Sequence, residues 1–199
     1  MICVVPIVEG DGEVQALPVL LRRLCQWLTP EGFVDYGRPI RVHRDRFLKR
    51  NTEFRRMLLL AAAKAGDTGW ILVLLDADDD CPVTLALDIA TRAREVLPNR
   101  PISVVCANRE FEAWFLASAE SLDGRRSLKV ALREVPADPD AIRGAKEWLS
   151  RRMTAGRYRE TTDQPAFAAI MDLEAARSRS RSFRKLCTDW SAFVTEPIA

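Results

Sequence analysis

Acidic side chains gather at two points of the chain, each at the end of an apolar segment. Residues 2–8 lead into EGDGE at 9–13, and residues 70–75 lead into DADDD at 76–80. Mg²⁺ prefers oxygen ligands and keeps several waters, so one or two protein carboxylates usually suffice to bind it. If the fold brings the two clusters together, they can hold one or two divalent cations. The alternative is that they cap helices, because Asp and Glu favour a first helical turn and Gly is common where a strand turns into a helix.

A parallel sheet would bring these clusters together. The first half of the sequence alternates β-rich segments with helical patterns, which is typical of βαβ units. The expected strands are 2–8, 40–43, 70–75 and 102–106, and the expected helices are 13–27, 52–65 and 83–96. We therefore expect an α/β fold with a mostly parallel sheet of about four strands flanked by helices.

The segment 70–75 is almost entirely apolar, which indicates a central strand buried on both faces. Open α/β sheets bind ligands beyond the carboxyl ends of their strands. The segment 108–116 follows the strand at 102–106 and is expected to be helical, so Glu112 lies shortly after a third strand end. Glu112 is a candidate ligand or supporting carboxylate, and an ordinary surface position is the alternative.

Beyond about residue 124 the β pattern disappears. Helices are expected at 127–135, 139–153, 164–177 and 182–195. The predicted organisation is an α/β core at 1–120 and an all-helical C-terminal extension at 121–199 that packs on it.

Composition limits the class of protein. At 199 residues, with 29% charged and 48% hydrophobic residues, the chain fits a globular protein with one main core. No apolar run reaches the roughly 18 residues of a membrane span, and charge at Glu9 comes too soon for a signal peptide. The five cysteines are widely spaced without a CxxC pair, so we expect reduced thiols and a cytoplasmic protein.

These motifs resemble a known family. An apolar strand ending in Glu9-Gly10 and a later one ending in DAD at 76–78 resemble the Toprim domain of primases, topoisomerases, recombination-repair proteins and OLD-type nucleases. More narrowly, the chain is similar to an uncharacterised bacterial Toprim-like family often encoded beside an ATPase. The segments that carry this similarity are VEGDGE at 8–13, LDADDD at 75–80, EAWFL at 112–116, YRET at 158–161, DQPAF at 163–167 and SFRKL at 182–186.

The resemblance implies roles for individual carboxylates. Asp76 and Asp78 would bind Mg²⁺ or Mn²⁺, with Glu9 close by as a ligand or general acid/base. Glu13 lies one helical turn beyond Glu9 and can join the metal ligands, or it can be a first-turn Glu that interacts with the helix dipole. Asp80 is a possible third ligand from the second cluster.

Basic residues supply candidate nucleic-acid contacts. Arg109 and Lys146 are candidates for stabilising transition-state charge, with ordinary salt bridges as the alternative. The net charge is only +2, so binding must come from a local patch such as the basic stretch near the C-terminus. Its candidate residues are Arg179, Arg181, Arg184 and Lys185; a solvated or salt-bridged helix face is the alternative.

The function we expect is a divalent-metal-dependent nuclease acting on DNA or RNA, as the effector of an ATPase-linked defence or toxin-like system. The alternative is a noncatalytic metal- or nucleic-acid-binding partner that regulates a separately encoded ATPase. A topoisomerase is disfavoured because the chain has no room for a separate tyrosine-bearing domain. A dinucleotide or P-loop site is disfavoured because GDG at 10–12 lacks the later glycine and the Gly-Lys-Ser/Thr sequence. An oligomer is possible.

Overall fold

A computed structural model describes residues 2–195 and contains one parallel sheet of five strands. The strand order is β2-β1-β4-β5, and β3 pairs with β1 beyond the end of β2. The bounds are β1 (Ile2–Val8), β2 (Val34–Tyr36), β3 (Ile40–Arg41), β4 (Trp70–Asp76) and β5 (Ile102–Ala107). The predicted α/β class with a parallel sheet is confirmed. The fifth strand, β2, was not predicted because three residues that include exposed Asp35 form no apolar run.

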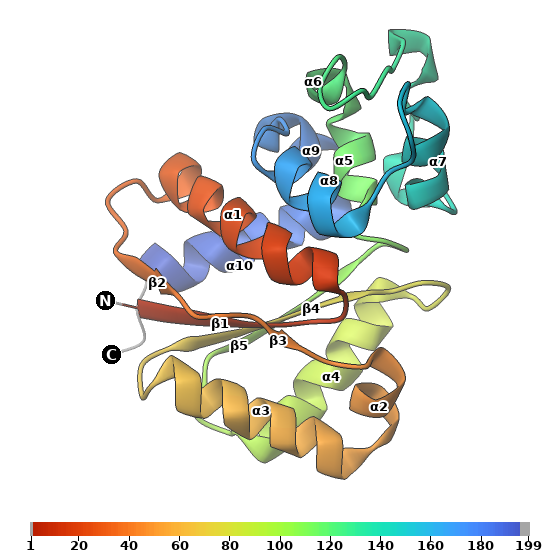
Figure 1. Ribbon diagram of the computed structural model, residues 1–199. Helices are drawn as coiled ribbons and strands as arrows, with labels where there is room; N and C mark the ends of the chain where they lie inside the picture. Colours follow the sequence, from red (N-terminus) through yellow and green to blue (C-terminus); the bar gives the residue numbers. More distant parts are fainter. Residues whose placement is uncertain (1, 196–199) are drawn as a thin grey trace.

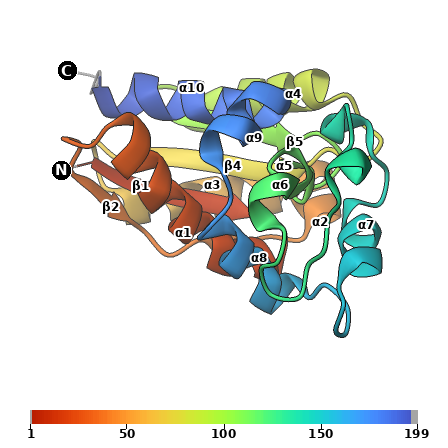
Figure 2. The same ribbon diagram turned by 90° about the horizontal axis from the view of Figure 1, so that it is seen from above.

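Helices cover both faces of the sheet (Figure 1). The lower layer holds α2 (Arg44–Lys49), α3 (Asn51–Ala65) and α4 (Pro82–Val96). The upper layer holds α1 (Asp11–Leu28) and α10 (Arg181–Thr195), with the remaining helices beside α1 (Figure 2). These are α5 (Ala113–Ala117), α6 (Ala119–Leu122), α7 (Ala145–Arg152), α8 (Glu160–Ala168) and α9 (Leu173–Arg179).

The pleat of the strands divides the core into two layers. In β4, the side chains of Trp70, Leu72 and Leu74 join the cluster under α1 and the C-terminal helices. The side chains between them, including Ile71 and Val73, join the cluster over α3 and α4. Alternate residues of a strand point to opposite faces, so a strand apolar on both faces must lie between two helical layers. The central strand predicted at 70–75 therefore lies between β1 and β5.

The C-terminal helices share the upper core with the sheet. Phe167, Phe183 and Trp190 are fully buried in the same cluster as Leu20 of α1. Most of this segment is helical, as expected, and α8 packs along α1. A boundary near residue 120 stays a prediction, because one continuous hydrophobic cluster joins the two parts.

Three of the four expected C-terminal helices differ from the structure. Residues 127–135 form no α-helix. Arg126 and Ser127 have φ of 46° and 67°, and Leu128 then forms a bridge with Met153. A short 3₁₀ turn (Leu132–Glu134) follows. The expected helix at 139–153 is a 3₁₀ turn (Pro139–Ala141) and then α7, separated by Gly144 at φ 69°.

The expected helix at 164–177 is in fact two helices. The α8 helix begins earlier, at Glu160, and ends at Ala168. The Asp172 side chain then accepts a hydrogen bond from the Ala175 N–H at 3.0 Å and caps the start of α9. The helix expected at 182–195 is confirmed as α10.

In the first half, the three expected helices are confirmed as α1, α3 and α4, with ends that differ by a few residues. The segment 108–116 turns first and becomes helical only from Ala113. Within residues 2–195, no helix is both long enough and apolar enough to cross a bilayer.

Candidate metal centre

The carboxyl ends of β1 and β4 define the position of the candidate site. After β1 the chain forms β2 and β3 on one side of that strand, and then places β4 on its other side. Such a reversal of strand order leaves a crevice at the carboxyl ends of the two central strands, where open α/β sheets bind ligands. Glu9 follows β1 directly, and Asp76 is the last residue of β4.

Asp76 lies at the centre of the carboxylates. Its Oδ1 accepts a hydrogen bond from the Phe111 N–H at 2.8 Å, which ties the end of β4 to the turn after β5. Burial raises the pKa of Asp76 well above its ordinary value, and the charges of Glu112, Glu13 and Glu9 raise it further, while Lys146 opposes them. The structure therefore brings Glu9, Glu13, Asp76 and Glu112 together.

Glu112 is completely buried. Its Oε1 accepts hydrogen bonds from the Tyr158 hydroxyl at 2.9 Å and from Gln164 Nε2 at 3.3 Å. Burial raises the pKa of Glu112 to about 8, although the positive charge of Lys146 lowers it. Its Oε2 is buried and has no hydrogen-bond partner within the described part of the chain.

Glu13 has a capping role. Its Oε2 accepts the Gly10 N–H at 2.6 Å at the start of α1, and its Oε1 accepts a hydrogen bond from Gln164 Nε2 at 3.2 Å. Both oxygens of Glu13 are thus engaged. The helix-cap interpretation holds for this residue, and its predicted place among the metal ligands stays a prediction.

Glu9 is half-buried and keeps one free oxygen. Its Oε2 is buried and has no hydrogen-bond partner among residues 2–195. Burial raises the pKa of Glu9, and the charge of Asp78 raises it further. Glu9 and Glu112 thus each have a buried carboxylate oxygen free to bind a cation.

Asp78 and Asp80 lie farther out and share Arg44. Arg44 Nη2 contacts Asp80 Oδ2 at 2.7 Å, and Arg44 Nε lies 3.5 Å from Asp78 Oδ2. Both aspartates are exposed. Asp78 therefore borders the site beside Glu9, whereas Asp80 forms its ion pair at the rim.

The backbone at the rim is strained at two non-glycine residues. Asp78 and Arg109 have φ of 49° and 64°, and the Asp78 N–H donates to the Arg109 carbonyl at 3.0 Å. Such conformations cost energy and cluster at functional sites. Arg109 Nη1 contacts Asp79 at 3.1 Å, and Arg143 pairs with the same carboxylate. Two cations thus share one anion beside the site.

Lys146 adds a positive charge to the carboxylate group. Its Nζ lies 3.2 Å from Glu160 Oε1, and its backbone N–H donates to Glu110 at 3.1 Å. Burial alone would lower the pKa of Lys146, but the nearby charges of Glu112, Asp76 and Glu160 outweigh burial and raise it. Lys146 is therefore a fixed cation in this site.

The donor set suits a hard divalent cation, and the free oxygens of Glu9 and Glu112 are suitable ligands. Within residues 2–195, however, no three His, Cys, Asp or Glu side chains are already arranged to hold a metal ion. Binding would therefore require a change of rotamer, most simply at half-buried Glu9 or exposed Asp78.

The basic residues near the C-terminus do not form one free patch. Arg179 donates to the Ala117 carbonyl at 2.9 Å and to the Pro136 carbonyl, so it joins two segments of the chain. Arg184 donates to the carbonyls of Arg177 and Ser178, and Lys185 pairs with Asp189. Arg181 is exposed, with no side-chain partner in the described residues.

Sequence reasoning assigned no role to Arg44, Tyr158 or Gln164. Tyr158 and Gln164 lie in the YRET and DQPAF segments that carry the family resemblance, which was the available signal for them. Their roles depend on contacts across 46 and 52 positions with Glu112, which no local pattern reveals. No sequence motif pointed to a role for Arg44.

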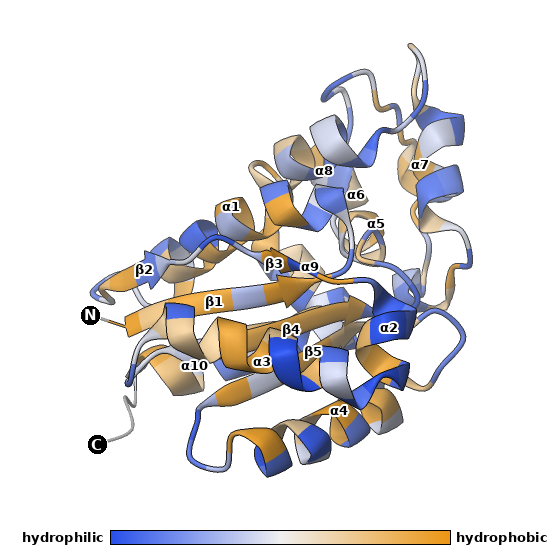
Figure 3. Ribbon diagram, turned by 60° about the horizontal axis from the view of Figure 1, so that its bottom comes forward, coloured by the Kyte–Doolittle hydropathy of each residue, from blue (hydrophilic) through white to orange (hydrophobic). Residues whose placement is uncertain are grey.

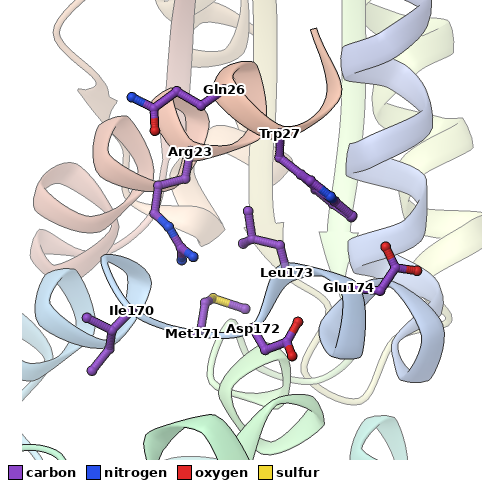
Figure 4. A pocket seen from close by; sticks show the side chains of 8 residues that line it. All are labelled: Arg23, Gln26, Trp27, Ile170, Met171, Asp172, Leu173 and Glu174. Carbon is purple, nitrogen blue, oxygen red and sulfur yellow. The ribbon is translucent and has the colours of Figure 1, made fainter. Parts of the chain in front are cut away.

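A separate hollow of about 480 Å³ lies between α1 and the segment that joins α8 to α9 (Figure 4). Arg23, Gln26 and Trp27 line it from α1. Arg23 lies twelve residues beyond Asp11, or about 18 Å along the helix. This hollow is therefore distinct from the carboxylate site.

Comparison with known proteins gives the family. The sequence profile of a domain of unknown function, DUF4276, matches residues 8–189. The chain belongs to this family. A comparison with the curated proteins found no match to this chain. A solved structure described as the C-terminal region of the Burkholderia pseudomallei OLD protein has a TM-score of 0.48 and 17% identity, covering 96% of this chain and 98% of that one. Membership of the Toprim branch stays a prediction.

Proposed function

We propose that this protein is a divalent-metal-dependent nuclease that hydrolyses phosphodiester bonds of DNA or RNA with Mg²⁺ or Mn²⁺. The observation that carries the proposal is the convergence of Glu9, Asp76 and Glu112 at the carboxyl ends of the strands, where Glu9 and Glu112 each have one buried oxygen without a partner in the described residues. The resemblance of its motifs to the Toprim domain of OLD-type nucleases supports the same chemistry.

The carboxylates and the basic residues of the site would have different functions. Asp76 and Glu9 would hold the ion, with Asp78 and Glu112 beside them. The bound ion would supply an activated water and neutralise charge on the phosphate. Lys146 lies among the carboxylates, and Arg109 and Arg143 pair with Asp79 on the loop after β4; all three would bind phosphate oxygens. A cationic rim explains how an acidic site could accept an anionic substrate.

The test is cleavage of plasmid DNA and of structured RNA by the purified protein with Mn²⁺ or Mg²⁺. We expect cleavage that EDTA abolishes and that Asp76→Asn or Glu9→Gln lowers at least about 100-fold. The matched control is Asp88→Asn, because Asp88 is exposed on α4 and pairs with Arg92. Cleavage that survives both site substitutions would show that the site is wrongly assigned.

A second candidate function is a noncatalytic metal- or nucleic-acid-binding partner of a separately encoded ATPase. Because no three ligand side chains among residues 2–195 are already arranged to hold a metal ion, this candidate is favoured in its nucleic-acid-binding form. The same assay, repeated with and without the ATPase, separates the two functions. A wild-type protein that binds Mn²⁺ through Asp76 but cleaves neither substrate under any condition would support the regulatory function.

A further inference from the structure

No strand within residues 2–195 pairs with the outer edge of β5. The Ile71 N–H donates to the Pro101 carbonyl and the Ala77 N–H donates to the Ala107 carbonyl, so the odd-numbered residues of this segment bond toward β4. In a parallel strand, alternate residues direct their backbone groups to opposite sides. Val104 and its even-numbered neighbours thus face outward, and no hydrogen bond reaches their backbone groups from the described residues.

This edge lies in a groove of about 830 Å³ between α4 and α10. On the α4 side, Val83 and Leu87 are 75% and 62% exposed, and the smaller Ala86 and Ala90 lie beside them. Figure 3 shows apolar segments along α4 at this border of the molecule. Natural proteins usually protect an apolar sheet edge with charges, proline or a covering element. This edge is suited to pairing.

The α10 side of the groove carries an ordered set of charges. Arg181, Lys185 and Asp189 lie at intervals of four residues and line the groove together, so the stripe has two positive charges followed by a negative one. An antiparallel copy of the same stripe would place Arg181 of each chain opposite Asp189 of the other. The two Lys185 side chains would then face each other at the two-fold axis. Each Asp189 would be shared between Lys185 of its own chain, with which it already pairs, and Arg181 of the other chain. The opposed stripes thus make two attractive Arg181–Asp189 contacts against one repulsive contact about the axis.

We propose that the occupant of this groove is a second copy of this chain. In this dimer the two β5 edges pair antiparallel about an axis near Val104, joining two five-stranded sheets into one. The exposed Val83 and Leu87 of each α4 pack on the other α4, where Ala86 and Ala90 allow close approach. This arrangement gives Arg181 a protein partner in place of the predicted nucleic-acid contact, and it does not depend on the proposed nuclease function.

The test is the mass of the protein measured by light scattering or analytical ultracentrifugation across a dilution series. We expect a dimer whose dissociation constant rises at least about tenfold in Leu87→Lys. Leu132→Lys is the matched control, because Leu132 is 71% exposed outside the groove. Both sites are exposed, so neither substitution should disturb the monomer fold, which circular dichroism checks.

A charge exchange tests the register of the proposed interface. Arg181→Asp and Asp189→Arg should each weaken the dimer, and the double variant should recover part of the loss. Hydrogen exchange should show Val104 and Cys106 amides that become protected as concentration rises in the wild type but not in Leu87→Lys. A wild type that is monomeric at every concentration, or a dimer that Leu87→Lys and Arg181→Asp leave intact, would overturn the proposal.

Discussion

The candidate site contains several closely spaced carboxylates whose ionised forms are destabilised in the absence of a cation. Asp76, Glu9 and Glu112 all have raised pKa values, because burial removes water and the neighbouring carboxylates repel one another. Lys146 offsets only part of this repulsion. Such a group is stabilised by protons at low pH, and a bound cation could replace those protons.

The destabilisation of the ionised carboxylates can be tested at Glu112 without any metal. Its pKa rises from an ordinary 4.5 to about 8 on folding, so between these values the folded protein holds a proton that the unfolded chain has released. The free energy of unfolding should therefore fall as pH rises through that window, by an amount on the order of a few kcal/mol. Glu112→Gln, which mimics the protonated form, should flatten this dependence.

The measurement is urea denaturation in EDTA at about pH 5.5 and about pH 9 for the wild type and the variant. Glu120→Gln is the control, because Glu120 is exposed on α6. An equally steep loss of stability in Glu112→Gln would show that other groups carry the pH dependence.

At the residue scale, the sequence predicted the acidic residues at the strand ends but not their partners. Glu9 and Asp76 could be predicted to meet because parallel strands place their carboxyl ends on one edge of the sheet. The helix-cap contact of Glu13 with Gly10 was one of the two alternatives, but the hydrogen bond from Gln164 could not be predicted, since it crosses 151 positions. The pairing of Asp80 with Arg44 likewise depends on the position of an unpredicted helix.

At the element scale, α8 joins the C-terminal layer to the carboxylates. Gln164 is fully buried and bridges Glu13 and Glu112, while Tyr158 just before the helix holds Glu112. This contact requires glycine at position 12, because a Cβ there would lie 1.9 Å from Gln164 Oε1. The close approach of α1 and α8 therefore depends on Gly12.

We expect Gly12→Ala to lower the free energy of unfolding by about 1–3 kcal/mol, because the added methyl group displaces Gln164. Gln164→Ala should also destabilise the protein, since it leaves buried carboxylate oxygens with fewer partners. In the double variant the clash is gone, so the combined loss should be smaller than the sum. Chemical denaturation of the three variants checks this; strictly additive losses would contradict the proposed contact.

Elements were predictable where burial on both faces or a long amphipathic pattern dominated. The apolar run of β4 and the leucine-rich face of α1 are such cases. The helix wrongly predicted at 127–135 shows where local patterns fail, because contacts with residues outside the segment determine its conformation. Asp123 Oδ1 accepts the Val130 N–H at 2.9 Å, and Leu128 pairs with Met153. By contrast, the start of α9 has a local signal in the sequence, because Asp172 is an N-cap residue.

At the scale of the whole molecule, the site lies where three parts of the chain meet. Glu9 and Asp76 come from the sheet, Glu112 from the start of α5, and Lys146 and Gln164 from the C-terminal helices. The C-terminal layer is thus part of the site. A fragment ending near residue 120 would lose these groups and expose the upper core.

The proposed function depends on these carboxylates forming one cation site. The most direct measurement is a crystal structure of the protein soaked in Mn²⁺, with anomalous scattering to locate the ion. We predict one or two ions at the carboxyl ends of β1 and β4, bound by Asp76 together with Glu9 or Asp78, with the side chains of the ligands rotated toward the metal. No anomalous peak within reach of Asp76 at saturating Mn²⁺, or an ion bound only elsewhere, would contradict the claim.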